Sequence, residues 1–448
     1  MQLNSQLDFG HTASSTVLFK KYVNFLMLFF PITSFLVIPT IPGTTIITFF
    51  AAILVMMIIM APGDDAKEQF ILELTYFMLI IIALSIISQM INLIETLKLP
   101  RTIILVNIKG FTKTFYRLSH LTQTLQLIVA FTIYLLVKHF SNDNIIKYIF
   151  WGLRLLCFYG LFEFVFYLLF HVNGDFISNR TFGDSKPGSL FQTIAIGGFG
   201  LVRMTSYTGE PSMFVFTVFP FWVLAVGLKR RFDSALLLCC LILSFSTTAY
   251  MCILIFTTGL MIYKKQFKLL FYSLIVIAAF CFALQLDLFK HLADSVYKSV
   301  FAGKVNGSTA SSRDRAGHFY EHFDYWLSFN SFNQLFGIGF GYVRSTDFIS
   351  TLLVNNGVIG VALITGFFYK KLLFKHKNEI SKYYKVGVIL LYFILMGTVP
   401  EFSYPSLWIF LALQYKLDRK EEGVPQTQLL NFNRSANNDI ELQHPKFV

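Results

Sequence analysis

The chain contains a succession of apolar runs, and this pattern constrains its fold more than any other feature. Several runs approach the length of about 20 residues that an α-helix needs to cross a bilayer. Within lipid only helices and closed barrels satisfy every backbone N–H and C=O group. The runs therefore predict an all-α, polytopic helical bundle in a membrane. They fall at about 22–39, 43–61, 71–93, 121–140, 148–172, 211–228, 234–262, 269–287, 347–369, 386–400 and 404–415.

The composition agrees with this interpretation. Only 14% of the 448 residues are charged, against about 25% in soluble domains. Polar residues 1–19 precede two lysines, and no small-residue cleavage site follows the first apolar run. We therefore expect 22–39 to be a retained first span rather than a signal peptide. The five cysteines all lie in apolar runs, which predicts neither disulfides nor a thiolate metal site.

Short basic clusters between the runs predict the topology. The positive-inside rule assigns such clusters to the cytoplasmic side. The run 234–262 lies between two of them, so it must leave the cytoplasm and return as two short spans. Its polar residues near the apex are Ser244, Ser246, Thr247 and Thr248. The clusters are Lys229-Arg230-Arg231, Lys264-Lys265, and Lys370, Lys371, Lys375 and Lys377.

This arrangement predicts about twelve transmembrane helices with both termini cytoplasmic. It puts two long polar segments, 173–210 and 288–346, on the same outer side, and we expect short helices in both. Residues 94–120 are also counted as outer although they carry several basic side chains. They are either a basic helix on the membrane surface or evidence of a miscounted span. The predicted parts are a cytoplasmic segment 1–19, a membrane domain 20–415, and a polar, disordered cytoplasmic tail 416–448.

The net charge of +12 has two explanations. The first is the positive-inside rule, which gathers lysine and arginine in cytoplasmic loops. The second is attraction to an anionic lipid or a lipid-linked phosphate. Under the second explanation, Arg180 and Lys186 in the first polar segment are phosphate candidates of low specificity.

Arg203 and Glu210 lie where the first polar segment meets the apolar run 211–228. An ionised group near the membrane is costly unless it is paired or used, so both are functional candidates. Pro211 suits the first position of a helix, whose N-terminus favours a phosphate. Arg203 can bind a diphosphate bidentately, and Glu210 can accept a proton from a sugar hydroxyl. The alternative is a salt bridge at the membrane surface.

The second polar segment contains a predicted helix with further candidates. Residues 311–314 have the spacing of a capping box, and Arg315, His318 and His322 then share one helix face. Cations beside aromatic rings suit a diphosphate next to a sugar, whereas the alternative is an amphipathic helix on the bilayer. The two histidines lack a third ligand at suitable spacing, so no metal site is predicted. The candidates are Arg313, Arg315, His318, His322 and Trp326.

Two other features have mainly structural interpretations. Glu163 lies deep in the run 148–172 and is expected to bond to a neighbouring span, with a proton relay as the alternative. The glycine-rich string 337–341 has no surrounding βαβ pattern, so it predicts a tight turn rather than a nucleotide-binding loop. The sequence shows no Ser-His-Asp set, Walker motif or metal-binding helix.

The order of these motifs resembles the bacterial O-antigen polymerase and ligase superfamily of membrane glycosyltransferases. The resemblance covers roughly 20–415, and its specificity comes from order and spacing because each motif is weak alone. Many members have an arginine after the serine of the paired-span motif, whereas Thr247 follows Ser246 here. The matching residues are Arg203 through Glu210-Pro211-Ser212, Leu243-Ser244-Phe245-Ser246, Leu335-Phe336-Gly337-Ile338-Gly339-Phe340-Gly341, and Asn356-Gly357-Val358-Ile359-Gly360.

The resemblance implies an inverting, GT-C-like glycosyltransferase of the bacterial inner membrane. It would act on the periplasmic face without metal, nucleotide sugar or other cofactor. Its arginines would hold the diphosphate of an undecaprenyl carrier, and a base would activate the acceptor hydroxyl. Carried onto this chain, the diphosphate ligands are Arg203 and Arg315, with Arg313 and Arg180 as further candidates; the base is Glu210 or His318; and His322 and Trp326 contact sugar or acceptor.

The Glu-Pro-Ser signature resembles the polymerases of this superfamily more than the ligases. The implied function is transfer of a growing glycan from undecaprenyl diphosphate to the terminal sugar of a new lipid-linked repeat unit. The alternatives are a ligase that transfers polymer to lipid A core, and a lipid-linked sugar flippase, against which the lack of a duplicated half argues. The expected partners are lipid-linked oligosaccharides, membrane lipid and a chain-length regulator, with no nucleic acid.

Overall fold

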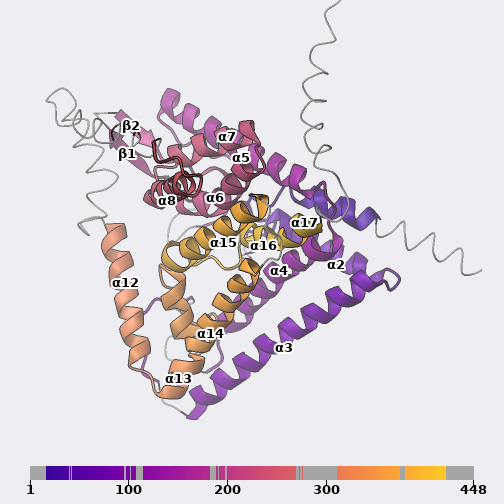
Figure 1. Ribbon diagram of the computed structural model, residues 1–448. Helices are drawn as coiled ribbons and strands as arrows, with labels where there is room; N and C mark the ends of the chain where they lie inside the picture. Colours follow the sequence, from indigo (N-terminus) through magenta and orange to yellow (C-terminus); the bar gives the residue numbers. More distant parts are fainter. Residues whose placement is uncertain are drawn as a thin grey trace, which may run out of the picture.

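A computed structural model shows a mostly helical chain with one two-stranded sheet among the residues it describes (Figure 1). The described residues are 17–39, 41, 43–94, 97–100, 102–106, 115–181, 188–189, 191–196, 199–268, 272, 275, 310–373 and 379–419. The predicted terminal segments and the predicted run 269–287 therefore lie almost wholly outside them. At the C-terminal side, helix α17 (Gln414–Arg419) continues into what was predicted to be disordered tail.

Five described helices are long and apolar enough to cross a membrane. This agrees with the predicted membrane protein, and three shorter apolar helices accompany them. The number of twelve crossings stays a prediction. The five long helices are α3 (Asp65–Ile94), α4 (Leu118–Phe140), α5 (Ile145–Phe170), α14 (Phe348–Leu372) and α15 (Glu379–Thr398), and the shorter ones are α2 (Ile46–Met60), α6 (Pro211–Gly227) and α8 (Thr247–Tyr263).

Helix α3 has an outward-facing apolar surface. It has the highest mean hydropathy of the five, 2.5, and only 11% of its most apolar window is buried inside the protein. It packs along α4 and lies at the edge of the bundle (Figure 1). A large exposed apolar surface is unfavourable in water and suits contact with lipid.

Helix α6 lies in the centre of the helical core. Every one of its residues except Val226 is buried, and α15, α7 (Arg231–Leu243) and α16 (Pro405–Ala412) pack against it. A helix that is apolar on all sides belongs in such an interior position. Pro211 is its first residue, as predicted, because the missing N–H of proline costs nothing there.

Two predicted spans differ in their continuity. The first, 22–39, is not one continuous helix: residues 17–26 are helical and turns occupy 27–31. Pro31 has no N–H for the hydrogen bond that a continued helix would need. The run 234–262 is divided as predicted, since α7 ends at Leu243 and α8 begins at Thr247.

The described part of the first polar segment contains a β-hairpin, which was not predicted, as well as one short helix. Strand β1 (Thr193–Ile196) pairs antiparallel with β2 (Phe199–Val202), and the 3-10 helix η1 (Ser206–Thr208) follows. The β-branched and aromatic residues of these strands favour extended backbone. The second polar segment does contain helices, α12 (Ala310–Leu327) and α13 (Ser331–Phe336).

The described part of 94–120 lies beside the second polar segment. The Val106 N–H donates to the Tyr342 carbonyl at 3.2 Å, and the Arg344 N–H donates to the Ile104 carbonyl at 3.1 Å. The Arg117 guanidinium lies over the Tyr342 ring, 4.8 Å from its centre. The described part of the basic segment therefore lies at the same end of the bundle as the second polar segment, and its described residues 97–100 and 102–106 are not helical.

Helix α14 is interrupted at Gly357, whose φ of 62° and ψ of −164° are not helical. The glycine-rich string lies against this break. The Ile338 N–H donates to the Val354 carbonyl at 3.0 Å, and the Gly339 N–H donates to the Asn355 carbonyl at 2.8 Å. The string thus forms the predicted turn, and it also supplies hydrogen bonds to α14.

Two glycines allow the two backbones to approach this closely. A Cβ on Gly337 would lie 2.2 Å from the Asn355 carbonyl carbon, and one on Gly357 would lie 2.3 Å from the Leu335 carbonyl carbon. Both glycines also have positive φ, at 70° and 62°. Any larger residue would therefore force these backbones apart and strain its own backbone.

We expect Gly337→Ala and Gly357→Ala each to lower the free energy of unfolding by at least about 1–3 kcal/mol, the usual cost of overpacking. Gly366 of α14 has open space around its Cβ position. Gly366→Ala is the matched control and should leave stability unchanged or slightly raised. Thermal unfolding in detergent measures all three, and equal stability would contradict the close approach.

Candidate functional site

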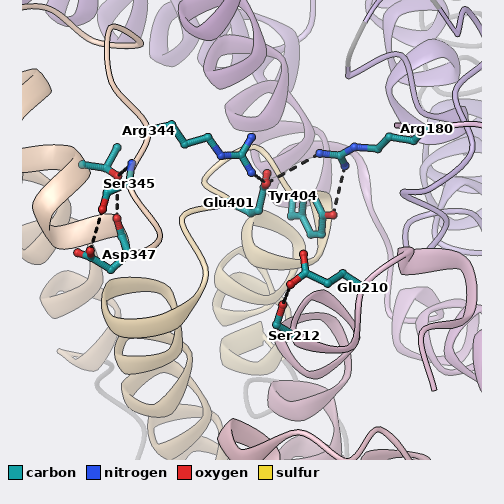
Figure 2. A network of polar contacts seen from close by, with 9 residues as sticks. Arg180, Glu210, Ser212, Arg344, Ser345, Asp347, Glu401 and Tyr404 are labelled. Atoms are coloured by element: carbon teal, nitrogen blue, oxygen red, sulfur yellow. Dashed lines mark hydrogen bonds and ion pairs between the residues drawn. The ribbon is translucent and has the colours of Figure 1, made fainter. Parts of the chain in front are cut away.

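Two arginines from distant parts of the chain meet at one buried carboxylate (Figure 2). Arg344 forms an ion pair with Glu401, and Arg180 Nη2 lies 3.9 Å from the same Glu401 oxygen. Arg180 Nη1 also donates to the Tyr404 hydroxyl at 3.2 Å. The Arg344 side chain is 46% exposed and the Glu401 side chain only 5%. The buried carboxylate is therefore paired with one exposed arginine, Arg344, and one largely buried arginine, Arg180.

The Arg344 backbone is fixed from two sides. Its own N–H donates to the Ile104 carbonyl at 3.1 Å. On the other side, the Asn355 side chain accepts from the Val343 N–H at 2.9 Å and donates to the Val343 carbonyl at 2.8 Å. Val343, the residue directly before Arg344, is thus hydrogen-bonded to the first half of α14.

Arg180 and Glu401 are held by equally local contacts. The Arg180 N–H donates to the Ser34 carbonyl at 3.0 Å. The adjacent Asn179 side chain accepts from the Leu36 N–H at 2.7 Å and donates to the Leu36 carbonyl at 2.9 Å. Glu401 lies in the turn between α15 and α16. The site therefore joins the first polar segment, the second polar segment and this turn.

The group combines cationic and anionic side chains. Burial acts to lower the pKa of Arg180, but the neighbouring Tyr404 and Glu401 outweigh it and raise the pKa, with a further contribution from Glu210. Arg344 is the more exposed of the two arginines, with 46% of its side chain exposed against 23% for Arg180. A phosphate group close to Arg344 would accept hydrogen bonds from its exposed N–H donors.

The arginines and Glu401 line a cavity of about 330 Å³, a size typical of small-molecule sites. Another part of the lining comes from α2 and α4. It includes the apolar Phe49, Ala52 and Val129 as well as the polar Thr48 and Gln126. One cavity therefore combines charged groups with a partly apolar wall.

Glu210 lies near this group but outside the cavity lining of the described chain. It precedes the first residue of α6, and its carboxylate accepts a hydrogen bond from the Ser212 hydroxyl at 2.6 Å. Its charge contributes to raising the pKa of both Arg180 and Tyr404. Figure 2 shows Glu210 on the other side of the Tyr404 ring from the Arg344–Glu401 pair.

Arg203 lies apart from the Arg180–Arg344 pair. Its guanidinium donates to the Gln192 side chain at 2.5 Å. It lines a second, much smaller cavity together with Glu163. Glu163 is buried and accepts from the Ser206 N–H at 2.9 Å, so it bonds to the first polar segment rather than to a neighbouring span.

The α12 candidates divide between exposed and buried positions. His318 is partly exposed and lies 3.3 Å from Glu321. His322 is completely buried, its Nδ1 lies 2.6 Å from the His318 carbonyl, and burial lowers its pKa. The Trp326 indole donates to the Gln334 carbonyl at 3.1 Å. The side chains of Arg313 and Arg315 lie outside the described part of the structure.

Arg344, Glu401 and Asn355 are site residues that the motifs do not identify. Arg344 precedes the apolar run 347–369, and Glu401 lies between 386–400 and 404–415. The argument that selects Glu210, an ionised group at the end of a span, applies equally to these two. Asn355 gives no such signal because a polar residue within a span has many possible partners. Among the described residues, no group of three His, Cys, Asp or Glu side chains could hold a metal ion.

Comparison of the chain with protein-family models and with curated proteins finds no match.

We expect Glu401→Gln to lower the free energy of unfolding by about 1–3 kcal/mol. Removing one partner of a buried ion pair costs more than this, but solvent around Arg344 reduces the loss. Glu379→Gln is the matched control, because Glu379 forms an exposed pair with Lys382 at 3.1 Å and its loss should not be measurable. Thermal unfolding compares the two, and wild-type stability of Glu401→Gln would contradict the shared-carboxylate arrangement.

Proposed function

We propose that this chain is a membrane glycosyltransferase that uses a lipid-diphosphate-linked sugar, and specifically a polysaccharide polymerase of the O-antigen type. The observation that carries the proposal is the cavity, in which a two-arginine group adjoins an apolar wall between two helices. A polyprenyl diphosphate has the same division between an anionic head and an apolar chain. The motif order described above supports the same class of enzyme.

In this proposal Arg180 and Arg344 bind the diphosphate, and Glu401 holds the two guanidinium groups in position. The acceptor hydroxyl attacks the anomeric carbon of the donor sugar, and the bond from that carbon to the diphosphate oxygen breaks. The lipid diphosphate leaves with the bonding electrons and its added negative charge. Cations already in place stabilise that charge without reorganisation, which is the usual main contribution to such catalysis.

Glu210 is the base that we favour for the acceptor hydroxyl, with His318 as the second candidate. Glu210 lies close enough to Arg180 and Tyr404 to influence their ionisation, whereas no contact of His318 with this group is shown. A carboxylate next to the diphosphate site can take the proton as the new glycosidic bond forms. The same proposal includes contact of His322 and Trp326 with the sugar or the acceptor, as the resemblance implies.

The proposed location is a bacterial inner membrane, with this site on the periplasmic side and about twelve spans. The basic Lys229-Arg230-Arg231 cluster lies at the end of α6 remote from Glu210, which supports a cytoplasmic position for the cluster. A ligase that transfers polymer to lipid A core has the same donor and remains the second candidate. The two differ in their acceptor, and the experiment below separates them.

Arg180→Ala and Arg344→Ala should each abolish polymer while the protein still accumulates in the membrane. The readout is a gel ladder of surface polysaccharide from a strain that lacks the chain and is complemented with each variant. Arg203→Ala is the matched control, because Arg203 lies outside this cavity, and it should retain polymer. Arg344→Lys should restore activity only in part, since lysine lacks the bidentate geometry of arginine.

The ladder also separates the proposed functions. In the strain without the chain, a single repeat unit on lipid A core indicates a polymerase, whereas bare core with accumulating lipid-linked polymer indicates a ligase. An unchanged ladder would contradict both. A normal ladder from Arg344→Ala would remove this arginine from the diphosphate site.

Ala52→Trp should reduce polymer synthesis strongly, because the indole would fill the apolar part of the cavity between α2 and α4. The matched control is Ile53→Trp, on the next residue of α2, which does not line the described cavity and is exposed. Both variants are compared in the same complementation ladder at equal protein level. Equal activity would show that the carrier lipid does not occupy this part of the cavity.

A further inference from the structure

Helix α13 has apolar side chains on its outside and a polar side chain on its inside. Phe332 and Leu335 are 65% and 44% exposed, and their spacing puts them on one face. Asn333 between them is completely buried. A helix on the surface of a water-soluble protein has the opposite arrangement. Apart from the exposed Ser331 at its first position, the polarity of α13 is therefore inverted, as it is in a helix with apolar surroundings.

Hydrogen bonds hold the polar side of α13 against the end of α3. Asn333 Nδ2 donates to Asn92 Oδ1 at 3.1 Å and to the Gly337 carbonyl at 3.2 Å. Asn333 Oδ1 accepts from Asn330 Nδ2 at 2.7 Å. The Asn92 side chain in turn donates to the Ile338 carbonyl at 2.6 Å. Buried amides that are satisfied in this way keep a fixed orientation.

The end of α3 has the same inverted arrangement. Gln89 and Asn92 are buried, whereas Met90, Leu93 and Ile94 are largely exposed. α13 packs against α3 (Figure 1), so the two helices with this arrangement lie at the same end of the bundle. α3 is itself long and apolar enough to cross a membrane.

We propose that α13 inserts into the bilayer, so that Phe332 and Leu335 contact lipid acyl chains. The second polar segment is predicted to lie wholly outside the membrane. Under this proposal, its residues 331–336 would form a re-entrant segment. Lipid is the expected occupant because α13 packs against α3, whose exposed side chains near this end are apolar, and because both helices have buried amide side chains. This inference does not depend on the proposed glycosyltransferase activity.

The insertion would set the depth of the candidate site. The Leu335 backbone touches Gly357 at the break in α14. On the same side of this break, Asn355 clamps the residue before Arg344. If α13 lies in lipid, these contacts fix the depth of Arg344 in the membrane. Arg344 would then lie above the acyl chains, at the level of the lipid phosphates.

Site-directed spin labelling of the full chain in liposomes tests the insertion. Label is placed at Phe332→Cys or Leu335→Cys after the native cysteines are replaced. The collision rate of the label with oxygen, which concentrates in lipid, is compared with its collision rate with a water-soluble nickel complex. Met90→Cys on the exposed face of α3 is the lipid control, and Asp324→Cys, at an exposed charged position of α12, is the water control.

The expected result is an oxygen-to-nickel ratio that matches Met90→Cys and exceeds Asp324→Cys several-fold. A high nickel collision rate at both α13 positions would overturn the proposal, because α13 would then lie in water. Low rates with both reagents would overturn it as well, since protein, such as a second copy of the chain, would then cover α13. If Phe332→Cys fails to accumulate, the Leu335→Cys result decides.

Discussion

One carboxylate shared by two arginines joins the two polar segments of this protein to the turn between α15 and α16. Glu401 faces Arg180 from the first polar segment and Arg344 from the second. The two segments are separated by the central helices α6, α7 and α8. Two neighbouring guanidinium groups repel each other. The buried carboxylate of Glu401 attracts both of them, and this attraction offsets the repulsion. The cavity, its charge and the meeting of the polar segments all depend on this interaction.

The helical framework was largely predictable because it follows from local chemistry. The split of 234–262 was visible in the polar residues at its centre, and Pro211 marked the start of α6. The side of 94–120 was not predictable, because its basic residues and the span count indicate opposite sides of the membrane. The first span was another exception: its helical part ends at Leu26 and turns follow up to Pro31, and an apolar run alone does not show whether the chain stays helical.

The site was predictable only in part, because its geometry comes from contacts across the whole chain. Glu210 and Arg203 were identified as ionised groups where a polar segment meets a span, and Arg180 only as a phosphate candidate of low specificity. Arg203 lines a different cavity from Arg180. Arg344 and Glu401 carry the same signal and were overlooked in favour of positions within family-like motifs. Asn355 acts through its hydrogen bonds to Val343, and no sequence pattern specifies a partner on a different element.

The break in α14 has a consequence for the order in which the chain assembles during synthesis. The carbonyls of Val354 and Asn355 receive N–H groups from the glycine-rich string, which in turn bonds to Gln89 and Asn92 of α3. The partners on α3 are made almost 250 residues earlier, with separations of 249 and 246. α3 therefore enters the membrane with the amides of Gln89 and Asn92 lacking these partners. This end of the bundle is completed only after the string emerges, which makes its closure a late, long-range step of folding.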